Sequence, residues 1–373
     1  MSDEHTARAA DGDGAPLSSA VVPAIGTVLA AVTLVAFLIP LRRGVDEFAL
    51  WIGITGALVT TGAFLARRHG LLERNIAGPI AAGSSLLVVV VSGYAITQGI
   101  LGSVVVPGLE WSVSLLFVAF FVGAGTIGIG VADAAGLSGR GLLDRLTLSV
   151  EMLVLAFVGL IGMSFAYLFL ELPVMLIAGE PTAFQGTVIE YLSVGVGLGA
   201  VAVGYLAFRG RDLSFIDLER PTLRTVGWIV GGIVLILAAN VGLSWLMSLV
   251  GIDGSDHTTT QQVADNPDLL LVIIPAMVLL VGPFEELLYR NIIQKSLYER
   301  FSRTGAVVVA SVVFTCVHIS AYATAGSGEL LASLSLLFVL ALILGTIYER
   351  TDNLLVPALV HGCYNAAIFL TML

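Results

Sequence analysis

The sequence predicts an all-α fold, a polytopic transmembrane helical bundle, and its composition and residue pattern both support this class. Of the 373 residues, 57% are hydrophobic and only 12% are charged, whereas a soluble globular protein carries about 25% charged residues. The apolar residues form long continuous runs, which excludes a transmembrane β-barrel, because barrel strands alternate apolar and polar residues. The formal net charge is −10 with no basic patch, so nucleic acid is not an expected partner.

Eleven segments are apolar enough to span a bilayer, which takes about 20 helical residues. In chain order they are residues 20–40, 47–66, 77–100, 111–133, 147–172, 187–208, 226–250, 268–289, 305–321, 329–348 and 354–372. The fifth run continues beyond Pro173. Because proline ends or kinks a helix, we expect the helix to end or bend there and residues 174–179 to form a re-entrant or interfacial piece.

The chain begins with an acidic stretch, residues 1–18, that is rich in small residues. It lacks the positively charged start of a signal peptide, and the apolar run that follows is long enough to span. We therefore expect a disordered acidic tail followed by a retained first helix.

Basic residues alternate between the loops, which predicts the orientation of the chain. They occur in loops 66–76, 134–146, 209–225, 290–304 and 349–353 and are absent from loops 101–110, 179–186, 251–267 and 322–328. This pattern puts 15 of the 17 basic residues inside, with Arg42 and Arg43 as the exceptions. It predicts an inside N-terminus, an outside C-terminus and a multi-pass protein of the cytoplasmic membrane.

The polar loop 251–267 marks the predicted domain boundary. Residues 19–250 form an N-terminal bundle of about seven helices, and residues 268–373 form a four-helix domain. Ionisable groups inside a bilayer cost about 2.5–3.5 kcal/mol each on insertion scales. Several such groups occur in the four C-terminal helices, so function is expected there.

Five ionisable residues and one amide form the candidate site. They are Glu285, Glu286 and Arg290 in the first of these helices, His318 in the second, and His361 and Asn365 in the fourth. Glu286 and Arg290 are four residues apart, so they share a helix face and are expected to pair. Glu285 is rotated about 100° from Glu286. It is expected to face His318 and His361 instead.

These residue types suit hydrolysis by an activated water molecule. A carboxylate beside a histidine can hold and deprotonate water. A second histidine and an asparagine amide can donate hydrogen bonds to a developing oxyanion. The same groups leave a metalloenzyme open, because Glu285, His318 and His361 are also a ligand set for catalytic zinc, with water in the fourth position.

Three short motifs resemble those of the CPBP family, which contains CAAX proteases and bacteriocin-processing enzymes. They are EELLYR at 285–290, which is similar to EExxxR, FTCVH at 314–318, similar to FxxxH, and HGCYN at 361–365, similar to HxxxN. The resemblance covers about residues 268–373.

The resemblance implies an intramembrane endopeptidase similar to the type II CAAX prenyl protease. It implies that Glu285 and His318 activate water, that His361 and Asn365 form the oxyanion hole, and that Glu286, Arg290 and Phe314 support the site. The implied partners are the bilayer and a membrane-anchored protein or peptide that could carry a lipid. A metal-free, glutamate-dependent reaction is favoured, with zinc as the alternative cofactor.

Two other functions fit the same groups. A non-catalytic scaffold or bacteriocin-immunity-type adaptor would keep the fold without the reaction, and a proton-coupled transporter would use the carboxylates and histidines as a relay. The predicted topology also makes the site open towards the cytoplasmic, basic loops.

Overall fold

The computed structural model describes residues 21–105, 108 and 111–372, so the predicted disordered tail at 1–18 lies outside the described residues. Of the residues that the structure describes, 81% are helical, in agreement with the predicted class. A short antiparallel hairpin begins in the predicted loop 101–110 and continues into the predicted span 111–133, whose helix starts only at Leu115. It consists of β1 (Ser103–Val105) and β2 (Ser112–Ser114), with Val104 opposite Val113.

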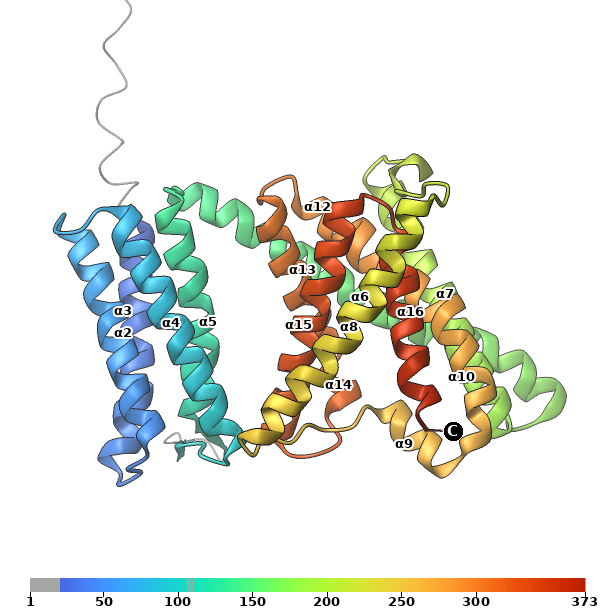
Figure 1. Ribbon diagram of the computed structural model, residues 1–373, viewed down its shortest axis with the longest axis horizontal. Helices are drawn as coiled ribbons and strands as arrows, with labels where there is room; N and C mark the ends of the chain where they lie inside the picture. The colour runs from blue at the N-terminus through green and yellow to red at the C-terminus, as the bar shows by residue number, and fades with distance from the viewer. Residues whose placement is uncertain (1–20, 106–107, 109–110, 373) are drawn as a thin grey trace, which may run out of the picture. The chain divides into compact units, whose positions relative to one another are not determined.

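Two compact units divide the chain, residues 1–144 and 145–373. In the described part of the first unit, four long helices flank or precede the hairpin (Figure 1). These helices are α2 (Val21–Arg42), α3 (Phe48–Arg68), α4 (Arg74–Thr97) and α5 (Leu115–Ala134).

Glycines let the first two of these helices pack closely. A Cβ on Gly53 would lie 2.3 Å from the ring of Phe37, and a Cβ on Gly26 would lie 2.5 Å from the ring of Phe64. Each phenylalanine therefore fills the space over a glycine of the neighbouring helix. In lipid, where the hydrophobic effect does not drive helices together, such close packing at small residues stabilises their association.

The second unit contains the motif helices. Before the polar loop lie α6 (Gly139–Ala178), which starts in the first unit, α7 (Ala183–Phe208), η1 (Leu213–Phe215) and α8 (Leu223–Leu249). After it come α9 (Thr258–Asp265), η2 (Pro267–Leu269), α10 (Leu270–Ala276), η3 (Met277–Val281), α11 (Gly282–Glu286), η4 (Leu287–Gln294) and α12 (Lys295–Leu297). The last four helices are α13 (Arg303–Val317), α14 (Ile319–Tyr322), α15 (Ser327–Thr351) and α16 (Leu355–Leu370).

The structural units do not divide at the predicted boundary, loop 251–267. Helix α8 precedes this loop but packs against α15 and α16 beyond it, because Gly232 lets Val360 and Ile347 approach within 2.6 and 3.0 Å of where a Cβ would be. The separate catalytic domain at 268–373 stays a prediction about function.

The expected end or bend of the fifth helix at Pro173 is not observed as a break. Helix α6 continues through Pro173 to Ala178 over 40 residues, so residues 174–179 do not form a separate re-entrant piece. Proline removes one backbone hydrogen bond, and membrane helices tolerate that loss when neighbouring groups compensate.

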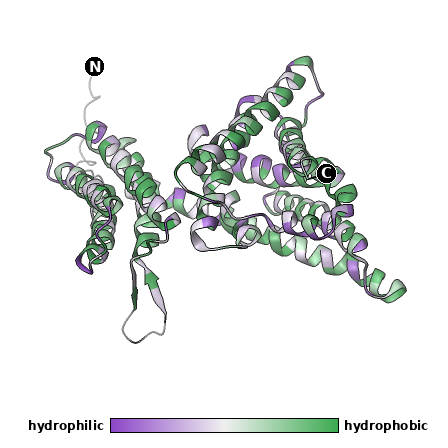
Figure 2. Cartoon of the chain, turned by 60° about the horizontal axis from the view of Figure 1, so that its bottom comes forward, coloured by the Kyte–Doolittle hydropathy of each residue, from purple (hydrophilic) through white to green (hydrophobic). Residues whose placement is uncertain are grey.

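Nine helices in the described residues are long and apolar enough to cross a membrane. Two shorter apolar helices, α13 and α16, occupy two further predicted spans. Hydrophobic residues, drawn green in Figure 2, cover most of each long helix. The number of eleven spans and the orientation of the termini stay predictions.

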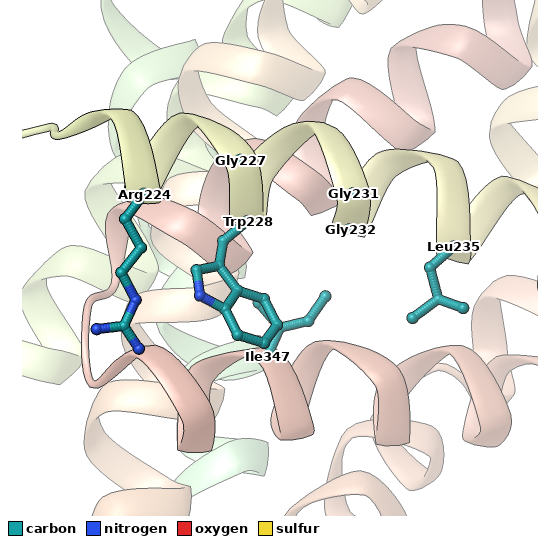
Figure 3. Close-up of a pocket in the computed structure, with 7 residues that line it drawn as sticks. All are labelled: Arg224, Gly227, Trp228, Gly231, Gly232, Leu235 and Ile347. Atoms are coloured by element: carbon teal, nitrogen blue, oxygen red, sulfur yellow. The ribbon is translucent and has the colours of Figure 1, made fainter.

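A surface hollow of about 530 Å³ lies along α8 and is lined by the side chains of Arg224, Trp228, Leu235 and Ile347 together with three glycines (Figure 3). None of the motif residues lines this hollow. The candidate site is therefore not in this hollow, and the buried polar side chains of the motif helices locate it instead.

Candidate active site

The helix that carries Glu285 and Glu286 is not a regular α-helix. A single α-helical turn, α11, lies between two π-helical segments, η3 and η4. Pro283 lacks the amide hydrogen that a regular α-helix would use at this position, so the ladder is already interrupted here. Such π-helical turns occur frequently at functional sites, and apolar periodicity alone did not predict them.

Two glycines bring the helix with the glutamates against the helix with His361. A Cβ on Gly282 would lie 2.4 Å from the carbonyl oxygen of Ala358, and a Cβ on Gly362 would lie 2.7 Å from the carbonyl oxygen of Met277. Because each glycine meets backbone atoms, no side chain can move aside to admit a methyl group. Gly282 lies three residues before Glu285 and Gly362 directly follows His361. The glycine contact therefore sets the distance between the two motifs.

Glu286 lies at the centre of a buried ionic chain. Arg290 Nε donates to Glu286 Oε2 over 2.9 Å, as the spacing of four residues predicted. His361 Nδ1 lies 2.9 Å from Glu286 Oε1. Glu286 and Arg290 are fully buried and His361 is 6% exposed. The contact between Glu286 and His361 was not predicted, since helix spacing says nothing about partners on other helices.

Glu285 lies on the other side of the same imidazole. Its Oε2 is 3.9 Å from His361 Nε2, a distance beyond hydrogen-bond range. Within the described residues, no hydrogen bond or ion pair joins Glu285 to His318. Of the two histidines that Glu285 was expected to face, it lies near His361 only. The hydrogen bond of the His361 ring is made with Glu286 instead.

His318 follows the last residue of α13, and its Nδ1 lies 2.7 Å from the carbonyl oxygen of Phe314. A carbonyl oxygen can only accept, so Nδ1 carries the hydrogen and the neutral ring keeps a lone pair on Nε2. The spacing of four residues in FTCVH thus has a physical reason. It lets the main chain of Phe314 select the tautomer of His318, with Nε2 available as a base or a ligand.

The ring of Phe314 fills the space between the motifs. Its centroid is 4.3 Å from that of His318 and 6.0 Å from that of His361. Tyr289 meets it edge to face at 5.0 Å, and the guanidinium of Arg290 lies over it at 5.2 Å. Phe314 therefore positions groups from three helices at once.

Asn365 lies one helical turn after His361 on α16 and is partly buried. No hydrogen bond to its side-chain amide is present among the described residues. The amide therefore retains its capacity to donate.

A second polar cluster, missed by the sequence analysis, lies next to Arg290. Asn291 donates to the hydroxyl of Tyr348 over 2.9 Å, and Tyr348 donates to Asp217 over 2.6 Å. Asp217 also accepts from Lys295 over 2.7 Å. We call Asp217, Asn291, Lys295 and Tyr348 the Asp217 cluster. In the sequence, Asn291 lies between the motif residue Arg290 and two isoleucines. A polar side chain at this position was the signal that could have indicated the cluster.

The described side chains do not gather as a zinc ligand set. Zinc would need ligand atoms of Glu285, His318 and His361 at about 2.0–2.2 Å from one ion. No group of three or more His, Cys, Asp or Glu in the described part of the chain is placed to hold a metal ion.

These helices define the chain as an integral, multi-pass membrane protein with a buried polar site in its second unit. Residues 267–367 match the family model of the Rce1-like type II CAAX prenyl endopeptidases. This match confirms the resemblance predicted from the three motifs and supports a CAAX-protease-type membrane endopeptidase. No curated protein and no solved structure gives a match. The first 266 residues lie outside the family match.

Proposed function

We propose that this protein is an intramembrane endopeptidase of the cytoplasmic membrane that cleaves a membrane-anchored protein or peptide by attack of an activated water molecule. The observation that carries the proposal is the position of His361 between Glu286, at 2.9 Å, and Glu285, at 3.9 Å. The match of residues 267–367 to the CAAX prenyl endopeptidase family supports the same conclusion.

Water activation falls to Glu285 and His318 in this proposal. The carboxylate of Glu285 makes no hydrogen bond with a described residue, and Nε2 of His318 has a lone pair because Nδ1 donates to Phe314. A water molecule can donate one hydrogen to each. As its oxygen bonds to the substrate carbonyl carbon, Glu285 takes one proton, which is general base catalysis.

His361 and Asn365 are proposed to hold the oxyanion that forms. Because Nδ1 of His361 donates to Glu286, Nε2 carries a hydrogen only in the protonated ring, and the 3.9 Å contact with Glu285 is too long to engage that hydrogen. Two carboxylates face one guanidinium in this cluster, and a positive charge on His361 makes the group neutral. The amide of Asn365 supplies a second donor from the same helix.

The tetrahedral intermediate then collapses and breaks its carbon–nitrogen bond. The leaving nitrogen takes the proton that Glu285 received, so the products are a carboxyl group and an amine and the carboxylate is regenerated. Glu286 and Arg290 do not touch the reacting atoms. They orient His361 through the hydrogen bond to Nδ1.

The test is cleavage by the purified protein in liposomes. The substrates are a library of membrane-anchored peptides that includes S-farnesylated CAAX tails and unmodified tails. We expect Glu285→Gln, His318→Ala and Asn365→Ala to abolish or strongly reduce cleavage while the protein stays folded. Full activity of Glu285→Gln would falsify the mechanism, and a wild-type protein that cuts nothing in the library counts against the function.

The same variants separate the alternatives. A cellular phenotype that survives substitution of Glu285, His318, His361 and Asn365 together would support the non-catalytic scaffold or adaptor. Substrate flux into liposomes without cleavage would support the proton-coupled transporter. Metal analysis of the active protein, with and without a chelator, tests the zinc alternative.

A further inference from the structure

The polar loop before the motif helices is attached to the helices next to the site. Ser333 donates to the carbonyl oxygen of Ser255 over 2.9 Å, and Thr324 donates to that of Asp256 over 2.7 Å. The amide of Ser255 donates to the carbonyl oxygen of Glu329 over 3.3 Å. In Figure 1, α9 and α14 lie at the same end of the second unit, opposite to α12. These bonds fix the position of the next residue, His257.

His257 presents a hydrogen-bond donor at this end of the site. Its Nδ1 accepts from the amide of Thr259 over 3.1 Å, where it caps α9. Because Nδ1 accepts, the hydrogen of the neutral ring is on Nε2. Burial lowers the pKa of His257, which keeps the ring neutral at pH 7. The ring packs edge to face on Tyr322 with centroids 5.1 Å apart.

Tyr322 lies one turn beyond His318, and its amide donates to the carbonyl oxygen of His318 over 3.3 Å. Burial, and then the charge of Glu285, raises the pKa of Tyr322 to about 12, so its hydroxyl stays protonated. Among the described residues, no hydrogen bond to this hydroxyl is present. The hydroxyl is a second available donor.

Tyr191 supplies a third donor from α7. It is 5% exposed, and its buried hydroxyl has no hydrogen-bond partner within the described chain. Thr259 is a polar neighbour of this hydroxyl, but the pair does not reach hydrogen-bond geometry. One turn further along α7, a Cβ on Gly195 would lie 3.3 Å from the ring of Phe284, the residue before Glu285.

We propose that Tyr191, His257 and Tyr322, here called the donor rim, bind backbone carbonyl oxygens of an extended peptide substrate next to the bond that is cut. This inference rests on the proposed endopeptidase function and names the part of the substrate that the site recognises. A peptide must unfold to reach Glu285, and each carbonyl that loses water without gaining a donor costs free energy. Three neutral donors without partners can supply the hydrogen bonds that such carbonyl oxygens need. Neutral donors suit neutral carbonyl oxygens, whereas a substrate carboxylate would bind more strongly to a cation.

The test measures binding to the full-length Glu285→Gln protein in nanodiscs, which retains the rim but lacks the proposed base. The probe is a fluorescent S-farnesylated peptide ending in a CAAX sequence. We expect Tyr191→Phe, Tyr322→Phe and His257→Ser each to weaken binding by roughly tenfold, the usual effect of one lost hydrogen bond to a buried group. Serine at 257 keeps the helix cap. Tyr94→Phe, at an exposed tyrosine of α4, is the matched control.

A second probe distinguishes direct contact from a structural effect. In this peptide a methylene group replaces the carbonyl beside the cleaved bond. We expect its loss of affinity and that of Tyr322→Phe to be non-additive, because both remove the same hydrogen bond. Additive losses, or unchanged binding in all three rim variants, overturn the donor rim and leave the proposed function standing. Full cleavage by Glu285→Gln overturns the proposed function instead.

Discussion

The two compact units bury polar groups in different ways. In the first unit, buried hydroxyls donate to carbonyl oxygens one turn back in their own helix, and Thr60 also contacts the hydroxyl of Ser84 on α4 at 2.7 Å. Thr60 donates to Gly56 over 2.9 Å, and Ser92 donates to Val88 over 2.7 Å. In the second unit, buried polar groups join different helices, as His361 on α16 joins Glu286 on α11. A hydroxyl that bonds to its own helix keeps that bond when neighbouring helices shift, whereas a buried carboxylate that also bonds to a side chain of another helix requires one arrangement of those helices.

One ion pair in the first unit allows a direct comparison. Arg67 lies 3.4 Å from Asp133, and the Arg67 side chain is 23% exposed. The pair Glu286–Arg290 is fully buried at 2.9 Å. In the first pair Asp133 is buried and only Arg67 reaches solvent, whereas both partners of the second pair are buried. This difference predicts that loss of the arginine costs more stability in the second pair than in the first.

The largest expected effect is a difference in cleavage rate between a substitution in the second unit and one in the first. Replacing Glu285 by Gln removes the proposed base, so cleavage should fall by about 10²–10⁴-fold. Replacing Asp133 by Asn removes a buried carboxylate of the first unit and should leave the rate per folded molecule unchanged. Rates are compared at equal amounts of folded protein. Similar losses in both variants would contradict the assignment of the reaction to the second unit.

The next effect is on stability. Replacing Arg290 by Leu leaves Glu286 buried without its cation, which should cost about 3–5 kcal/mol of unfolding free energy. Replacing Arg67 by Leu should cost less, since the Arg67 side chain is 23% exposed and water reaches that side of the pair. Thermal unfolding in detergent measures both variants, and equal shifts of the midpoint would show that burial does not distinguish the pairs.

A smaller effect is expected from the glycine contacts. Replacing Gly362 by Ala places a methyl group against the backbone of Met277, which should cost about 1–3 kcal/mol and reduce cleavage by displacing His361. Gly53→Ala in the first unit meets only the ring of Phe37, which can shift, so its cost should be smaller and cleavage should not change. Unfolding midpoints and cleavage rates are measured together, and the prediction fails if Gly53→Ala is the more damaging change.

The smallest expected effect concerns the Asp217 cluster. Replacing Tyr348 by Phe removes the hydroxyl that joins Asp217 to Asn291 and should cost about 1 kcal/mol. We expect no change in kcat, because no hydrogen bond or ion pair among the described residues joins the cluster to Glu285, His318 or His361. A large fall in kcat with normal stability would instead assign the cluster a part in the reaction.

Sequence reasoning predicted what a single helix determines. The four-residue spacing predicted the pair Glu286–Arg290, and the apolar runs predicted the positions of the motif helices. It could not predict that His361 contacts Glu286, because this depends on the contact of Gly282 and Gly362 with backbone atoms of the opposite helix. The π-helical segments also escaped prediction, since a wider turn leaves little trace in an apolar pattern.

The sequence did not determine where along its helix each site residue lies or from which end of the helices the site is reached. In the structure, α13 has only 15 residues and ends at Val317, directly before His318, so a helix end lies at the site. Tyr322, whose amide donates to the carbonyl oxygen of His318, and His257, which packs on Tyr322, come from the end with loops that lack basic residues. The expected opening towards the basic loops stays a prediction.

Lys295 is the one lysine in the sequence, and its ammonium group is held by Asp217 and by the carbonyl oxygen of Phe215. An amine-reactive reagent can therefore modify a single side chain in the described part of the molecule. Because only the released, deprotonated amine reacts, the labelling rate at Lys295 reports how often the loop between α7 and α8 detaches from the motif helices. The protein thus carries a built-in chemical probe of motion next to its candidate active site.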